Sequence, residues 1–114
     1  MKKIIFILMI FCFCQCIKQS NTDNLDNIDC STINSKYSAD IKPIISANCF
    51  GSGCHSSGSS KGDFTTYSGL KAIADNGSLE SNVITNQSMP PSAPLSLDDR
   101  KKIKCWIKSG SPNN

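Results

Sequence analysis

Several residue types that usually build a soluble domain are scarce in this chain. Its 114 residues include one histidine and one tryptophan, and aromatic residues make up only 7%. No apolar run approaches the roughly 20 residues that a membrane-spanning helix needs. Lys plus Arg (12) and Asp plus Glu (9) nearly balance, and the absence of a basic stripe argues against nucleic-acid binding. A small domain with so thin a core usually needs a disulfide, a metal or a bound cofactor.

Residues 1–16 have the pattern of an export signal. A basic Lys2-Lys3 start precedes an apolar run over 4–13, which is too short for a comfortable membrane span. Three cysteines end the run, and Cys16 is the candidate for lipidation as the first residue of a bacterial lipoprotein. Ordinary cleavage nearby and an uncleaved anchor are the alternatives. We therefore expect an exported protein, either periplasmic or held at a membrane by a lipid on Cys16.

The remaining chain divides into a tether and one domain. Residues 17–36 are rich in Asn, Asp, Ser and Thr, which predicts a flexible polar tether. The domain is expected over 37–114. Its hydrophobic spacing indicates an all-α fold with long loops, because no segment alternates convincingly as a strand.

Four helical segments are expected in this domain. The first covers 38–48 with Ser38 as its cap, and regular helix begins near Lys42 because Pro43 is tolerated only in a first turn. A second helix follows Thr65 or Thr66 and ends at Asn76-Gly77. One further turn is expected over 81–86. The last helix begins at a Ser96 cap, and its apolar face carries Ile103, Trp106 and Ile107. Gly110 and Pro112 end it.

The segment Cys49-Phe50-Gly51-Ser52-Gly53-Cys54-His55 carries the clearest chemical signal. A Cys-x-x-Cys-His sequence marks covalent haem attachment, in which two thiols bind the porphyrin and the histidine becomes an axial iron ligand. Here four residues separate the cysteines, as in a variant form of that motif. Gly51 and Gly53 give the backbone the freedom to accommodate the extra residues.

Two other interpretations of these cysteines remain open. Cys49 and Cys54 would form a disulfide in an oxidising compartment. Alternatively, they would bind zinc, but a tetrahedral zinc site would then have to recruit Cys30 and Cys105 as well. His55 is the only histidine, and its place directly after the second cysteine favours haem.

Met89 is the candidate for the second axial ligand. It is the only methionine outside the signal segment, and it directly precedes Pro90-Pro91 in a polar stretch. A methionine thioether opposite histidine raises the haem potential. The alternative is a Met that fills the core, although such residues more often lie in helices among apolar neighbours.

The chain from Tyr37 to Asn114 resembles a class I c-type cytochrome domain. It is similar to small bacterial cytochrome c-like lipoproteins in four stretches: Tyr37-Ser38-Ala39-Asp40-Ile41-Lys42-Pro43-Ile44, the Cys49–His55 segment, Ser88-Met89-Pro90-Pro91, and Trp106-Ile107-Lys108-Ser109-Gly110-Ser111-Pro112-Asn113-Asn114. The haem segment and the Met-Pro-Pro step are the specific parts.

The resemblance implies a fold around one covalently attached haem c. The first and last helices would cross beside it, with Ile41, Ile44 and Ile45 meeting Ile103, Trp106 and Ile107. Because those helices would be adjacent, a Cys30–Cys105 disulfide is expected, with two free buried thiols as the alternative. The short stretch between His55 and Met89 implies a compact domain with an exposed haem edge. The lysines at 101, 102, 104 and 108 are expected to form a solvated helix face.

The predicted function is that of a monohaem c-type cytochrome that carries one electron outside the cytoplasm. No catalytic triad, carboxylate pair or phosphate loop is visible, so an enzyme is not expected. Redox proteins are the expected partners. Two alternatives stay open: a haem-free surface lipoprotein stapled by disulfides, and a haem sensor or enzyme with an open iron site.

Overall fold

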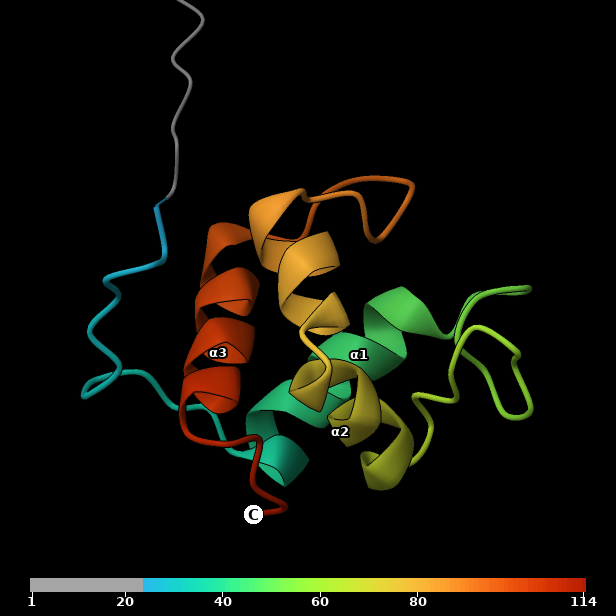
Figure 1. Ribbon diagram of the computed structural model, residues 1–114, viewed down its shortest axis with the longest axis horizontal. Coiled ribbons are helices and arrows are strands. Elements are labelled where there is room, and N and C mark those ends of the chain that lie inside the picture. The colour runs from blue at the N-terminus through green and yellow to red at the C-terminus, as the bar shows by residue number, and fades with distance from the viewer. Residues whose placement is uncertain (1–23) are drawn as a thin grey trace, which may run out of the picture.

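The computed structural model describes residues 24–114 (Figure 1). Helices η1 (Tyr37–Ile41) and α1 (Lys42–Cys49) are continuous, and they are followed by α2 (Tyr67–Asp75), η2 (Glu80–Thr85) and α3 (Leu97–Lys108). Within the described range there is no strand, which confirms the all-α prediction. None of the helices in that range is long and apolar enough to cross a membrane. The predicted export signal at 1–16, with Cys16, lies outside the described residues.

Local sequence signals set most helix boundaries. Pro43 lies in the first turn of α1, and regular α-helix begins at Lys42 as expected. The Thr66 hydroxyl accepts a hydrogen bond from the Gly69 amide at 3.1 Å, and Ser96 accepts one from the Asp99 amide at 3.1 Å. These two caps satisfy amides that α2 and α3 would otherwise leave unpaired. Both caps were among the sequence-based expectations.

The start of the first helix differs from expectation. Ser38 does not cap it, because η1 already begins at Tyr37. Asn114 takes that role instead: its side-chain oxygen accepts from the Tyr37 amide at 2.8 Å, and its main-chain oxygen accepts from the Ser38 amide at 2.9 Å. A residue from the far end of the domain thus satisfies the orphan amides of this helix start.

The core joins the first and last helical segments. Ile41 and Ile45 from η1 and α1 are at most 1% exposed, and Ile103 and Trp106 from α3 are fully buried in the same cluster. Tyr37 stacks against Trp106 with 5.9 Å between ring centroids, and Tyr67 meets the edge of Tyr37 at 5.0 Å. The predicted meeting of the isoleucine face with α3 is therefore observed, with an aromatic cluster at one end of it.

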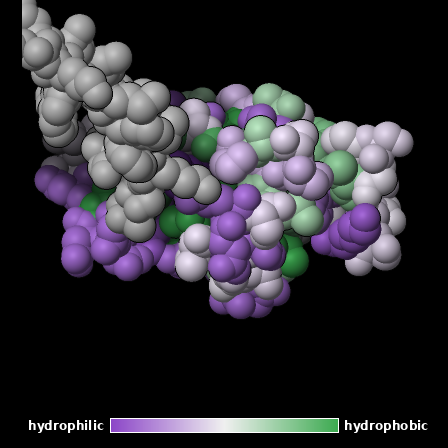
Figure 2. Space-filling model, turned by 90° about the horizontal axis from the view of Figure 1, so that it is seen from above, coloured by the Kyte–Doolittle hydropathy of each residue, from purple (hydrophilic) through white to green (hydrophobic). Residues whose placement is uncertain are grey.

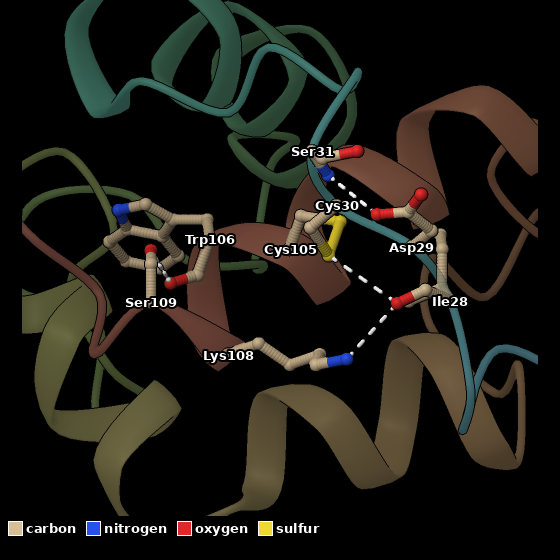
Figure 3. The surroundings of a disulfide bond; sticks show 8 residues. All are labelled: Ile28, Asp29, Cys30, Ser31, Cys105, Trp106, Lys108 and Ser109. Carbon is tan, nitrogen blue, oxygen red and sulfur yellow. Dashed lines mark hydrogen bonds between the residues drawn. A yellow bond between two sulfur atoms is a disulfide. The ribbon is translucent and has the colours of Figure 1, made fainter.

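Residues 24–36 pack against the domain, unlike the free tether that their polar composition predicts. Leu25 is 6% exposed and belongs to the core cluster. Cys30 is bonded to Cys105 of α3 across 75 positions, as expected. Figure 3 shows that Lys108 reaches the same segment, donating to the carbonyl oxygen of Ile28 at 3.0 Å. One apolar side chain and one disulfide therefore attach a segment whose average composition is polar.

Lys104 is an exception to the solvated lysine face expected on α3. It is 8% exposed, and its ammonium group forms an ion pair with Glu80 of η2. Such a pair keeps a largely buried charge compensated. The contact ties α3 to η2, the helix that precedes the Met89 loop.

Gly69 is required by close approach of α2 to the preceding loop. A Cβ atom at this position would lie 1.8 Å from the carbonyl oxygen of Asp63. We therefore predict that Gly69→Ala lowers the free energy of unfolding by at least 2 kcal/mol (an order-of-magnitude value for forced backbone displacement), despite the higher helix propensity of alanine. Chemical denaturation would measure the change. Ser68→Ala, next in the chain, is the control, and equal stability of the two variants would contradict the prediction.

Candidate functional site

All four predicted site residues line one cavity. It has a volume of about 300 Å³, and Cys49, Cys54, His55 and Met89 are among its lining residues. Cys49 is the last residue of α1, Cys54 and His55 lie in the loop that follows it, and Met89 lies in the loop that connects η2 to α3. Figure 1 shows both loops projecting from the helices. The wall between them is largely apolar and includes Ile45, Phe64, Leu79, Val83, Leu95 and Ile103.

The loop from Cys49 to His55 closes on itself. The His55 amide donates to the Cys49 carbonyl at 3.0 Å, and the Cys54 amide donates to the Gly51 carbonyl at 2.9 Å. Gly53 takes a φ of +76°, a left-handed conformation that favours glycine. The turn absorbs the longer spacing between the cysteines, so that both sulfur-bearing residues and the histidine line the same cavity.

His55 is held at two points. Its Nδ1 lies 3.3 Å from the Gly62 carbonyl oxygen, and because a carbonyl only accepts, this contact is a hydrogen bond when Nδ1 carries the proton. The ring lies flat on Phe64, with 3.9 Å between centroids and 1° between planes. Nε2 is then the nitrogen left with a lone pair, which is the form that a metal-binding histidine takes.

Met89 lies on the opposite loop and is 41% exposed, which does not fit a methionine that fills the core. The main-chain oxygen of Asn82 accepts from the Ser88 amide at 2.9 Å and from the Met89 amide at 3.2 Å. These bonds fasten the loop to η2. Figure 2 views the molecule from the side of this loop, where strongly apolar residues reach the surface only in small areas. Met89 thus combines exposure with a fastened backbone beside the cavity.

Both cavity cysteines are free thiols in the structure. Burial, and secondarily the neighbouring Cys54, raise the pKa of Cys49 to about 11. Cys30 and Cys105 are bonded to each other, so they are not available for the zinc site that would have required them. Within residues 24–114, no group of three or more His, Cys, Asp or Glu side chains is placed to hold a metal ion by itself.

Comparison with protein-family models, curated proteins and solved structures gave no match. The chemistry of this site is therefore argued from its own residues.

The chain's fit to a haem rests on its donor set. Covalent attachment of a haem uses cysteine thiols, and the protein must also supply donors to its iron. Two free thiols, one imidazole with its Nδ1 already engaged, and one thioether all lie at a single apolar cavity. Lys61 is the only Lys, Arg, Asp or Glu among the lining residues, and its ammonium group donates to the Gly53 carbonyl at 3.1 Å.

Sequence reasoning missed Gly62, Phe64 and Asn82. Gly62 and Phe64 hold the imidazole, while Asn82 holds the methionine loop. Two of these contacts use main-chain carbonyl oxygens. Every residue has such an oxygen, so the residue type does not predict these contacts. Phe64 could have been noticed as a large aromatic residue beside a Gly- and Ser-rich loop.

The raised pKa of Cys49 predicts slow alkylation of the haem-free protein. The test uses a Cys54→Ala variant, in which Cys49 is the remaining free thiol of the domain. Iodoacetamide reacts with the thiolate form of a cysteine and not with the thiol. Burial, the larger cause, still raises the pKa of Cys49 in this variant, so the rate should rise about tenfold per pH unit through pH 8–10. Mass spectrometry of quenched samples measures it. A plateau below pH 9 would contradict a buried thiol.

Proposed function

We propose that this protein is a monohaem c-type cytochrome, an exported carrier of single electrons. The observation that carries the proposal is the convergence of Cys49, Cys54, His55 and Met89 on one apolar cavity. The two loops that bring them together are far apart in the sequence. A resemblance based on short motifs did not by itself require this convergence.

The chain's own residues would divide the work. Cys49 and Cys54 would hold the porphyrin covalently through their sulfur atoms. His55 would bind iron through Nε2, with Gly62 holding Nδ1. Met89 would supply a thioether that favours reduced iron. The apolar wall would exclude water from the site.

A haem bound here supplies an iron centre that changes by one electron between its ferric and ferrous forms. His55 and Met89 would hold the iron, and the chemistry it would supply is electron transfer rather than substrate binding. Redox proteins outside the cytoplasm are the proposed partners. The packing of η1 and α1 against α3 supports a cytochrome c-like fold, in which the haem completes a core that the chain alone fills incompletely.

A visible spectrum tests the proposal. The full chain is expressed with a periplasmic haem-attachment system, purified, oxidised and then reduced with dithionite. We expect a sharp α-band in the reduced form and a weak long-wavelength band in the oxidised form, which together indicate a haem with His/Met ligation. Acid-acetone extraction should leave the colour with the protein, because the thioethers hold it.

Each alternative function gives a different result in this experiment. A folded, colourless protein would contradict the cytochrome and favour a haem-free lipoprotein stapled by a disulfide. A coloured protein whose reduced form binds carbon monoxide at once would favour an open-site sensor or enzyme. The Cys49→Ala/Cys54→Ala variant is the control, and it should lose the covalent colour.

A further inference from the structure

Phe64 makes the closest ring contact of the candidate site. Its ring and the imidazole of His55 are parallel to within 1°, at a centroid distance of 3.9 Å. Phe64 is 6% exposed and belongs to the hydrophobic core, and its amide donates to the His55 carbonyl at 3.0 Å. The phenyl ring is therefore held by the core, and the Phe64 backbone is bonded to the backbone of His55.

The hydrogen bond at Nδ1 holds the imidazole only loosely. Its length of 3.3 Å exceeds the usual range for an N–H donor and an oxygen acceptor, so small rotations of the ring cost little. Contact with a flat, immobile face restricts these rotations, because turning the imidazole would push its edge into the phenyl ring. The two contacts together restrain the ring plane more tightly than the long hydrogen bond alone.

Gly62 makes room for this arrangement. A Cβ atom at Gly62 would lie 3.2 Å from Cε1 of Phe64 and 3.6 Å from Cγ1 of Ile73. Its φ of +106° is also a conformation that side chains rarely adopt. A glycine at 62 thus lets its carbonyl face His55 while the phenyl ring stays flat on the imidazole.

We propose that Phe64 is the positioning residue that sets the plane of the His55 imidazole at the iron. This inference rests on the proposed function. The plane of an axial imidazole determines how its π-orbital overlaps with the iron d orbitals, and so it determines the low-spin signature of the ferric haem. Groups around a ligating histidine commonly orient it in this way, usually through a hydrogen bond at the second nitrogen. In this chain the stacked ring of Phe64 further restricts rotation of the His55 imidazole.

The test compares electron paramagnetic resonance spectra of the ferric haem-bound protein and three variants. Phe64→Leu keeps an apolar side chain but removes the flat face, so we expect shifted or broadened low-spin g-values. Phe64→Tyr keeps the face and should give the wild-type g-values. Ile84→Ala, which removes three carbons from a buried core residue of η2 that does not line the cavity, should also leave them unchanged. Unchanged g-values in Phe64→Leu would overturn the inference, since the contact would then be packing alone.

A second pair of variants keeps the inference testable if Phe64→Leu fails to fold. Gly62→Ala places a methyl group against the phenyl ring, while Gly58→Ala carries a similar backbone strain, at φ +75°, into open space. We expect shifted g-values in the first and wild-type values in the second. Equal spectra for the pair would overturn the inference. A wild-type protein without haem would instead refute the proposed function on which the inference rests.

Discussion

In the proposed haem-bound protein, replacing Met89 with alanine should lower the reduction potential by on the order of 100 mV or more, with the haem still covalently attached. Axial ligands tune haem potentials over a range of about 0.8 V, and a thioether opposite histidine is at the high end. Attachment should survive, because Cys49 and Cys54 belong to the opposite loop. The reduced variant should also bind carbon monoxide, since one axial position becomes open. Redox titration and a carbon monoxide difference spectrum measure both effects.

Met89→Leu separates the sulfur donor from the volume of the side chain. Leucine fills nearly the same space as methionine but cannot bind iron, so it should lower the potential as alanine does. Pro91→Ala is the matched control, because Pro91 lines the same cavity and offers no donor. The potential should stay near the wild-type value in that variant. A wild-type potential in both Met89 variants would show that another group, or none, occupies the second axial position.

The helix boundaries were predictable because their signals are local. Pro43 marks a first turn through its own ring, and Thr66 and Ser96 cap helices whose amides lie three residues away. The apolar face that buries Ile103 and Trp106 follows from helical spacing alone. These features depend on a few neighbouring residues, so the sequence displays them directly.

The contacts that sequence analysis missed join distant parts of the chain. Asn114 caps the helix that starts at Tyr37, and Leu25 enters the core from a polar stretch. Lys104 resembles the other lysines of α3 in sequence, yet it is buried and Glu80 of another helix compensates its charge. Periodicity and composition average over short windows, and none of these partners lies within such a window.

The candidate site divides in the same way. Its four chemical groups were identifiable because cysteine, histidine and methionine are rare in the domain and have distinctive chemistry. Their orientation was not identifiable, because it depends on the Gly62 carbonyl, the Phe64 ring and the Asn82 carbonyl. A motif therefore predicts which side chains form the site, whereas the contacts that orient them can be identified only from the folded structure.

Removing the Cys30–Cys105 disulfide should cost on the order of 4 kcal/mol of stability. The bond closes a loop with a sequence separation of 75, and in the chain-entropy account long loops give the largest stabilisation. In a domain of this size, such a loss lowers the melting temperature by roughly 15 °C or more. The double variant Cys30→Ala/Cys105→Ala avoids a lone thiol, and alanine suits position 105, which is 1% exposed. Calorimetry with and without the disulfide measures the shift.

The haem spectrum should not change in this variant, because neither cysteine lines the cavity. Lys108→Ala is the control for the segment that carries Cys30. It removes the exposed hydrogen bond to the Ile28 carbonyl and the attraction to Asp29, and it should change stability by less than about 0.5 kcal/mol. If the double variant and the wild type have the same melting temperature, the disulfide adds no stability beyond that from the burial of Leu25. If it melts at a lower temperature and also loses its haem spectrum, the core around α3 and the cavity form a single cooperative unit. The disulfide in that core would then support the geometry of the iron ligands in the cavity.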